Sequence, residues 1–110
     1  MPQAVRETTM NYATLAIERL REGQHARIKP HGNSMRPRVN DGDLVTLAPA
    51  EPATLKAGDI VLVRCKGRVL LHLIKAIDGP RFLIGNNHGG INGLVGPSAI
   101  YGIATTIEHR

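Results

Sequence analysis

Two apolar runs in this chain begin with the same dipeptide, a glycine followed by an aspartate. Gly42-Asp43 leads into one run and Gly58-Asp59 leads into the next. This dipeptide is typical of the turn before a strand, because glycine accepts a positive φ and aspartate bonds nearby backbone N–H groups. We interpret both pairs as turn residues that shape a sheet and take no part in chemistry.

The rest of the chain after Gly23 also consists of short apolar runs separated by glycine or proline. The expected strands are residues 26–29, a strand that starts at Leu44, and residues 60–64, 68–77, 81–84 and 100–107. About six short strands with tight turns are typical of antiparallel all-β domains. The sequence therefore predicts a mainly β fold of coiled antiparallel sheets or a partly open barrel.

One helix is predicted before these strands. Its apolar stripe is formed by Met10, Ala13, Ile17 and Leu20, which recur at helical spacing. Thr8 or Thr9 is available to cap its start, and Gly23 can take the left-handed conformation that ends it. We expect residues 1–24 to form a helix packed on a β domain of residues 25–110, within a single domain.

Composition limits the classes of function. The chain has 110 residues and one cysteine, Cys65, so we expect no disulfide framework, no metal site and no cofactor. Its net charge is +5, but the basic residues are scattered and aromatic residues make up 3%, so nucleic acid is a disfavoured partner that stays open. The longest uncharged stretch, residues 86–107, is broken by Gly, Asn and Pro97, and the N-terminus has no apolar signal core. We expect no membrane span and a soluble, cytoplasmic protein.

The segment from Gly32 to Pro37 contains the candidate nucleophile, Ser34. Gly32 permits a sharp bend and Pro37 stiffens the exit, so a hydroxyl between them can project outward. The alternative is an ordinary polar surface turn, which is the commoner meaning of a lone Gly-x-Ser. A serine also needs a base to remove its proton.

The longer string, Ser34-Met35 with Pro37 and then Gly42-Asp43 and a strand, resembles the nucleophile box of type I signal peptidases and LexA-like serine peptidases. Residues 70–74 resemble the Val-His-Arg-Val strand of signal peptidases that use a Ser-His pair, and residues 85–87 resemble their Gly-Asp-Asn box. The resemblance covers roughly residues 28–107. It implies the coiled-sheet fold of that superfamily.

The resemblance also implies a base for Ser34. His72 matches the base position of both templates and needs little adjustment of its pKa to act near neutral pH. Lys75 is the alternative base, which fits only if the strand is shifted and which needs a strongly lowered pKa. Strand alternation puts the two side chains on opposite faces, so at most one points at Ser34.

Further roles are implied around this pair. We expect the backbone N–H groups near Ser34, helped by Asn33, to bind the oxyanion, and Asn86 to orient His72. Asn86 stands where signal peptidases carry an aspartate, so it cannot stabilise the imidazolium by charge. Met35 and Asn87 are expected to contact substrate. Residues 85–93, rich in Asn and Gly, form either a wall of the cleft or an irregular surface loop.

The function predicted from these residues is that of a soluble serine endopeptidase-like protein. Only 33 residues precede Ser34 and no Ala-Gly bond of the self-cleaving type occurs among them, so cutting of another polypeptide is preferred. The substrate would be an extended peptide bound along a strand edge. The alternative is a catalytically silent peptide- or protein-binding module of the same fold, associated with a DNA-binding regulator.

Overall fold

The computed structural model describes residues 8–110, with side chains from Ala13 onward. Its elements are the helix α2 (Thr8–Arg21) and the strands β1 (Ala26–Ile28), β2 (Leu44–Pro49), β3 (Ile60–Cys65), β4 (Arg68–Asp78), β5 (Arg81–Gly85), β6 (Ile91–Val95) and β7 (Ile100–Glu108), with short 3-10 turns at Pro52–Thr54 and Pro97–Ala99. The predicted apolar contact of Met10 and the predicted cap by Thr8 or Thr9 concern side chains outside the described ones.

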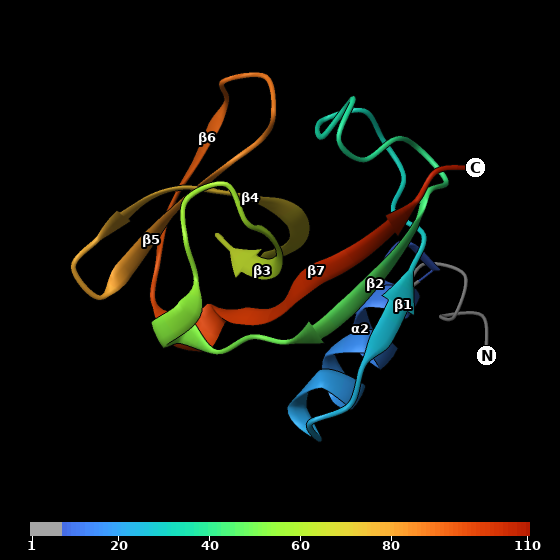
Figure 1. Cartoon of the computed structure of the whole chain (residues 1–110), viewed down its shortest axis with the longest axis horizontal. Coiled ribbons are helices and arrows are strands. Elements are labelled where there is room, and N and C mark those ends of the chain that lie inside the picture. Colours follow the sequence, from blue (N-terminus) through green and yellow to red (C-terminus); the bar gives the residue numbers. More distant parts are fainter. Residues whose placement is uncertain (1–7) are drawn as a thin grey trace.

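The strands of this part of the chain form one antiparallel sheet in the order β1-β2-β7-β3-β4-β5-β6. The sheet curls strongly, so β5 and β6 lie away from the plane of β1, β2 and β7 (Figure 1). Its two outermost strands, β1 and β6, do not pair with each other, and the curl does not close into a barrel. The predicted mainly β, partly open fold is confirmed.

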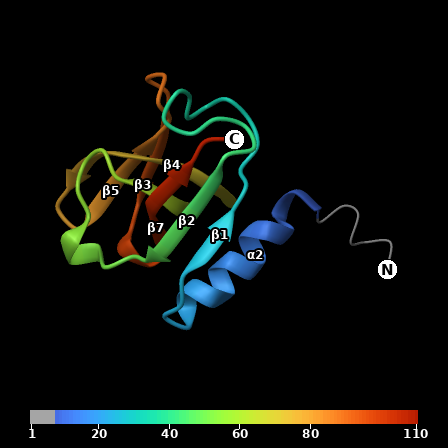
Figure 2. The ribbon, with the colours of Figure 1, turned by 45° about the vertical axis from the view of Figure 1, so that its right-hand side comes forward.

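The helix α2 lies beside β1 and covers one end of the sheet (Figure 2). Ala16, Ile17 and Leu20 are buried in the same apolar cluster as strand residues of β1 and β2. The helix ends as predicted: Gly23 has a φ of 81°, and its N–H donates to the Leu20 carbonyl at 3.0 Å. Helical spacing therefore located the buried stripe, and Gly23 located the end of the helix.

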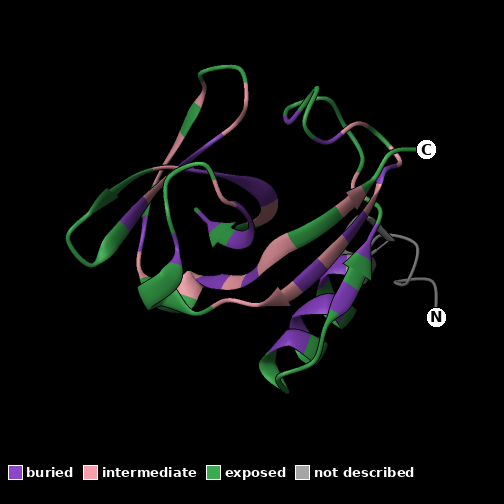
Figure 3. Cartoon of the chain, viewed as in Figure 1, coloured by how far each residue is buried: buried purple, intermediate pink, exposed green. Residues whose placement is uncertain are grey.

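The curled sheet has apolar clusters on both faces, and β3 contributes to each. Ile60 and Leu62 belong to the cluster under α2, whereas Val61 and Val63 belong to the second cluster, with Phe82. Successive strand residues point to opposite faces, so a strand buried on both faces has a continuous apolar run in its sequence. Figure 3 shows the buried residues following the inner strands and the inward side of α2.

The two Gly-Asp pairs form matching turns. Asp43 Oδ2 accepts the backbone N–H of Asn40 at 2.8 Å, and Asp59 Oδ2 accepts that of Lys56 at 2.9 Å. The intervening glycines, Gly42 and Gly58, have φ values of 83° and 96°. Each aspartate is occupied at a strand entry, as predicted, and each glycine takes a conformation that other residues rarely adopt.

The Asn- and Gly-rich run of residues 85–93 is neither wholly a cleft wall nor an irregular loop. It contains the turn between β5 and β6 and the first residues of β6, a strand that the sequence did not predict. The composition concealed it, because Asn and Gly have low β propensity. Pairing with β5 stabilises this strand although its own residues do not favour a β conformation.

Candidate active site

The loop between β1 and β2 carries Ser34, and we call its residues 30–42 the serine loop. Met35 and Val39 are buried in the cluster under α2, and the Val39 N–H donates to the Met35 carbonyl at 3.0 Å. At the base of the loop, the Gly32 N–H donates to Asp41 Oδ1 at 2.7 Å. The buried side chains of Met35 and Val39 thus attach the loop to the core, and Ser34 remains exposed.

The turn between β5 and β6, residues 86–90, holds the serine loop from the other side; we call it the hairpin tip. The backbone N–H of Asn87 donates to the Ser34 carbonyl at 3.0 Å, and its side-chain amide donates to the Arg36 carbonyl at 2.8 Å. His88 Nε2 donates to the Asn33 carbonyl at 3.0 Å. The predicted substrate-binding residue Asn87 thus lies at the serine loop and fixes its backbone.

The structure brings Ser34 and His72 together. Ser34 Oγ lies 3.1 Å from His72 Nε2, although 38 positions separate the residues in the chain. His72 lies on β4 opposite Val61 of β3, and 8% of it is exposed. A nucleophile-base pair needs a hydrogen bond of this length. The exposed serine and the buried histidine meet that requirement.

The other nitrogen of His72 is bonded to Asn92, a residue that the sequence analysis missed. Asn92 Oδ1 lies 2.8 Å from His72 Nδ1. An amide oxygen only accepts hydrogen bonds, so Nδ1 carries the proton and Nε2 is left as the acceptor that faces Ser34.

A β-bulge explains why Asn92 reaches His72. Gly93 pairs with Ile84 and Ile91 pairs with Gly85, so Asn92 is the extra residue of β6 at this point. Such a bulge turns one side chain away from the regular alternation of the strand. The following Gly93 has a φ of 149°, which favours glycine. In the sequence, Asn92 was only one of several asparagines in the Asn-Gly run, and no local signal singled it out.

Asn86, predicted to orient His72, lies in the hairpin tip instead. Its Oδ1 accepts the backbone N–H groups of His88 and Gly90, both at 2.8 Å. It therefore organises the turn, and the side chain bonded to His72 is that of Asn92. The family box identified the correct segment, but the aligned residue is not the one that contacts the imidazole.

Lys75, the alternative base, is the extra residue of a second bulge, between Ile74 and Ala76 of β4. Its Nζ donates to the Asn86 carbonyl at 2.9 Å, in the hairpin tip. The residue at hydrogen-bond distance from Ser34 Oγ is His72.

Burial lowers the pKa of His72 below its ordinary value of 6.5. The cost of desolvating an imidazolium is the main cause, and the positive charge of Arg68 lowers the pKa further. The hydrogen bond to Asn92 acts in the opposite direction. His72 is therefore neutral near pH 7, which is the form that can accept the serine proton.

A cavity of about 340 Å³ opens beside the pair. Its lining comprises Pro30, His31, Gly32, Ser34, Met35, Val39, Asn40, Arg68, Val69, Leu70, Leu71, His72 and Asn92. Met35, the other predicted substrate contact, lines it but is itself buried in the core. The pairing of β4 with β5 begins only at Leu73, so residues 68–72 of β4 have an unpaired edge. The cavity thus combines the hydrogen-bonded pair of Ser34 and His72 with a free strand edge.

The backbone N–H of Ser34 is one of the groups expected to bind the oxyanion. Among the described residues it has no hydrogen-bond partner, whereas the N–H of Gly32 is already used by Asp41. Asn33, predicted to assist, lines a separate hollow with Arg36, Pro37 and His88. Its side chain does not line the cavity that contains Ser34 and His72.

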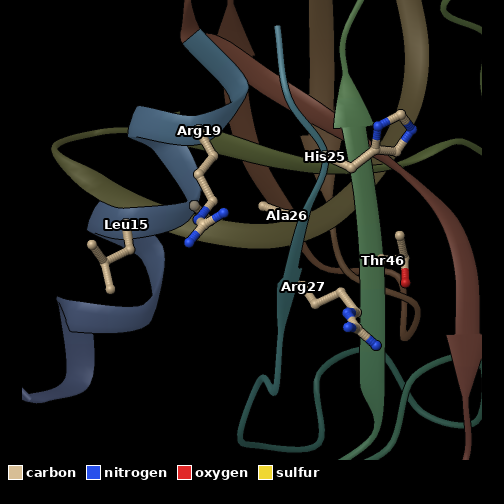
Figure 4. Close-up of a pocket in the computed structure, with 7 residues that line it drawn as sticks. Leu15, Arg19, His25, Ala26, Arg27 and Thr46 are labelled. Carbon is tan, nitrogen blue, oxygen red and sulfur yellow. The ribbon is translucent and has the colours of Figure 1, made fainter. Parts of the chain in front are cut away.

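A larger cavity, of about 620 Å³, lies at the other end of the sheet, between α2 and the first two strands. Figure 4 shows Arg19 reaching from α2 toward Ala26 of β1, with His25, Arg27 and Thr46 beyond it. It contains no serine or cysteine and no paired base. Cavity size alone therefore does not identify the candidate active site.

The described residues offer no candidate metal centre. They include no group of three or more His, Cys, Asp or Glu side chains placed to hold a metal ion. Cys65 is a free, buried thiol. No helix in residues 8–110 has the length and apolarity needed to cross a membrane.

The curled antiparallel sheet, with a serine on a loop beside a histidine on a strand, defines the class as the LexA- and signal-peptidase-like serine peptidase superfamily. A family model described as Peptidase S24-like matches residues 2–92, a segment that contains Ser34, His72 and Asn92. The chain belongs to this family. A search of curated proteins found no match.

Proposed function

We propose that this protein is a serine endopeptidase that cuts another polypeptide, with Ser34 as nucleophile and His72 as general base. The hydrogen bond of 3.1 Å between Ser34 Oγ and His72 Nε2 is the observation that carries the proposal. Asn92 supports it because its oxygen selects the tautomer in which Nε2 can accept a proton.

In the first half of the reaction, Ser34 Oγ attacks the scissile carbonyl while its proton passes to His72 Nε2. The Ser34 N–H stabilises the negative oxygen of the tetrahedral intermediate. His72 then returns the proton to the leaving amine, and the C–N bond breaks to leave an acyl ester on Ser34. Water, activated by the same nitrogen, hydrolyses the ester.

The free edge of β4 supports an extended peptide as substrate. Residues 68–72 lack a strand partner on the side of the cavity, and a peptide added there would lie alongside His72. This arrangement places the scissile bond near Ser34 and every second side chain of the peptide against the same face of β4.

The neutral side chain of Asn92 favours one alternative function, that of a catalytically silent peptide-binding module. Asn92 orients the imidazole but cannot stabilise the imidazolium by charge, and that loss slows peptidases of this type. In this alternative hypothesis, the cavity binds a peptide and releases it uncut.

A serine-reactive fluorophosphonate tests the proposal, with intact mass as the readout. We expect one adduct on the wild-type protein, none on Ser34→Ala or His72→Ala, and a retained adduct on Lys75→Ala. Ser34→Ala should keep the wild-type melting temperature, because its side chain is exposed. No adduct on the wild type between pH 6 and 9, repeated with a peptide boronate, would support the silent module.

A further inference from the structure

The charges around the cavity of Ser34 and His72 are unbalanced. Arg68 and His31 line it, and no carboxylate does. His31 Nδ1 lies 3.4 Å from Asp41 Oδ1, so a protonated His31 is already paired. Arg68 is exposed, and no hydrogen bond or ion pair of the described residues involves its guanidinium. It is the uncompensated charge of this site.

Arg68 also lies on the strand edge that is free to take a peptide. It begins β4, four residues before His72, and both belong to the segment that β5 leaves unpaired. Alternation along a strand puts Arg68, Leu70 and His72 on one face. A peptide paired with this edge therefore presents its alternate side chains to the same three residues.

We propose that Arg68 selects substrates with an acidic side chain, placed two or four residues from the substrate residue that lies opposite His72. This inference rests on the proposed function for the position of the peptide, and it adds the substrate class. A carboxylate matches the planar donor fork of a guanidinium, and a lysine at the same position would be repelled.

A bound carboxylate would assist the chemistry as well as the binding. In the free protein, the charge of Arg68 lowers the pKa of His72 and so disfavours the imidazolium that acyl transfer requires. A substrate carboxylate paired with Arg68 would offset that charge. The substrate would then supply, from outside, part of the negative charge that the neutral Asn92 does not provide.

A peptide fits this site better than a nucleic acid does. The free edge offers backbone donors and acceptors in strand geometry, which a peptide backbone complements. Aromatic side chains for base stacking are scarce, at 3% of the chain. The partner of the cavity is therefore an acidic peptide in extended form.

The test measures binding on Ser34→Ala protein, so that no turnover occurs. The probes are fluorescein-labelled peptides of about eleven residues, built from Ala, Val and Ser, with a single Glu, Gln or Lys moved through each position. At the best position we expect Glu to bind about tenfold more tightly than Gln, as for a hydrogen-bonded ion pair, and Lys to bind more weakly than Gln.

Two further variants identify the residue responsible. Adding Arg68→Gln should bring Glu and Gln to within about twofold of each other, a difference no larger than an exposed ion pair gives. Arg81→Gln removes the same charge from the exposed first residue of β5 and should leave the preference intact. The proton resonances of the His72 ring report the pKa of His72 independently. This pKa should rise in Arg68→Gln. It should also rise when the Glu peptide binds, but not when the Gln peptide binds.

The outcomes separate this inference from the proposed function. A Ser34 adduct on the wild type, combined with equal binding of Glu and Gln peptides, would overturn the acidic preference and leave the peptidase intact. Absence of the adduct, combined with a Glu preference that Arg68→Gln abolishes, would support Arg68 as an acid-binding residue of a silent module. No binding by any peptide, a preference that survives Arg68→Gln, or tighter binding of a labelled single-stranded oligonucleotide would each overturn the inference.

Discussion

The imidazole of His72 is held between two side chains, and its Nδ1 lies 2.8 Å from Asn92 Oδ1. Asn92 belongs to β6, two strands away from β4 in the sheet. A bulge in β6 turns this side chain toward His72, where a peptidase with a charged triad carries a carboxylate. The resulting site has the geometry of a Ser-His-carboxylate triad without the negative charge.

Restoring that charge should increase reactivity. In Asn92→Asp, a carboxylate next to His72 Nδ1 stabilises the imidazolium, so we expect fluorophosphonate labelling of Ser34 at pH 8 to become about tenfold faster or more. Asn86→Asp is the matched control, because Asn86 contacts the hairpin tip and not His72. Equal acceleration by both variants would contradict the assignment of Asn92.

The pH dependence of labelling should follow the lowered pKa of His72. In the proposed mechanism the neutral imidazole is the reactive form, and burial keeps it neutral below the ordinary pKa of 6.5. The rate should therefore rise with pH, reach half its maximum below pH 6.5 and then stay level. In Asn92→Asp the midpoint should move to higher pH. A wild-type midpoint well above 6.5 would indicate a different base.

The hairpin tip should control the serine loop. Asn87→Ala removes the bond to the Arg36 carbonyl and His88→Ala removes that to the Asn33 carbonyl. We expect each to lower the free energy of unfolding by about 1 kcal/mol or less, and to slow labelling about tenfold, because Ser34 is displaced from His72. His25→Ala, an exposed histidine of the distant cavity, should change neither quantity.

Gly85 should be intolerant of any side chain. A Cβ there would clash with the Gly90 carbonyl oxygen and would lie 2.9 Å from Lys75 Cγ. Gly85→Ala should lower the free energy of unfolding by about 1–3 kcal/mol, as other overpacked sites do. Gly96→Ala meets no atom within 4 Å and has a φ of −84°, so its effect should stay within about 0.5 kcal/mol. Urea unfolding of the two variants measures the difference.

The two matching turns should differ in their contribution to stability. The carboxylate of Asp43 is buried and accepts hydrogen bonds from the Asn40 N–H, from His109 Nδ1 at 2.6 Å and from the Arg110 N–H at 3.2 Å. Among the described residues, the carboxylate of Asp59 accepts a hydrogen bond only from the Lys56 N–H. Asp43→Asn should therefore lower the melting temperature more than Asp59→Asn.

The same contacts give the effect of Asp43 a defined pH dependence. The Asn40 N–H is the main cause that lowers the pKa of Asp43 below 3.8, and His109 and Arg110 add to it. The ionised form is therefore favoured in the folded state. The stability it contributes is present above pH 3.8 and is lost as the pH falls through the lowered pKa. The difference in melting temperature between wild type and Asp43→Asn should shrink over the same interval.

Local chemistry was enough to predict most of the fold. Helical spacing and Gly23 defined α2, and the Gly-Asp pairs marked the entries to β2 and β3. Each of these signals depends on residues within a few positions of one another, so it can be read without knowing the tertiary structure. The β6 strand was not predicted, because its own residues do not favour a strand and its stability comes from pairing with β5.

We could predict the candidate nucleophile, the preferred base and the segment that holds them in place from local sequence patterns. Ser34 and His72 could be named because each lies in a short pattern of its own. The folded chain was needed to show which asparagine contacts His72, where Lys75 points and which edge of β4 stays free. Those outcomes depend on two bulges and on where strand pairing begins, and these are set by the packing of the whole curled sheet rather than by neighbouring residues.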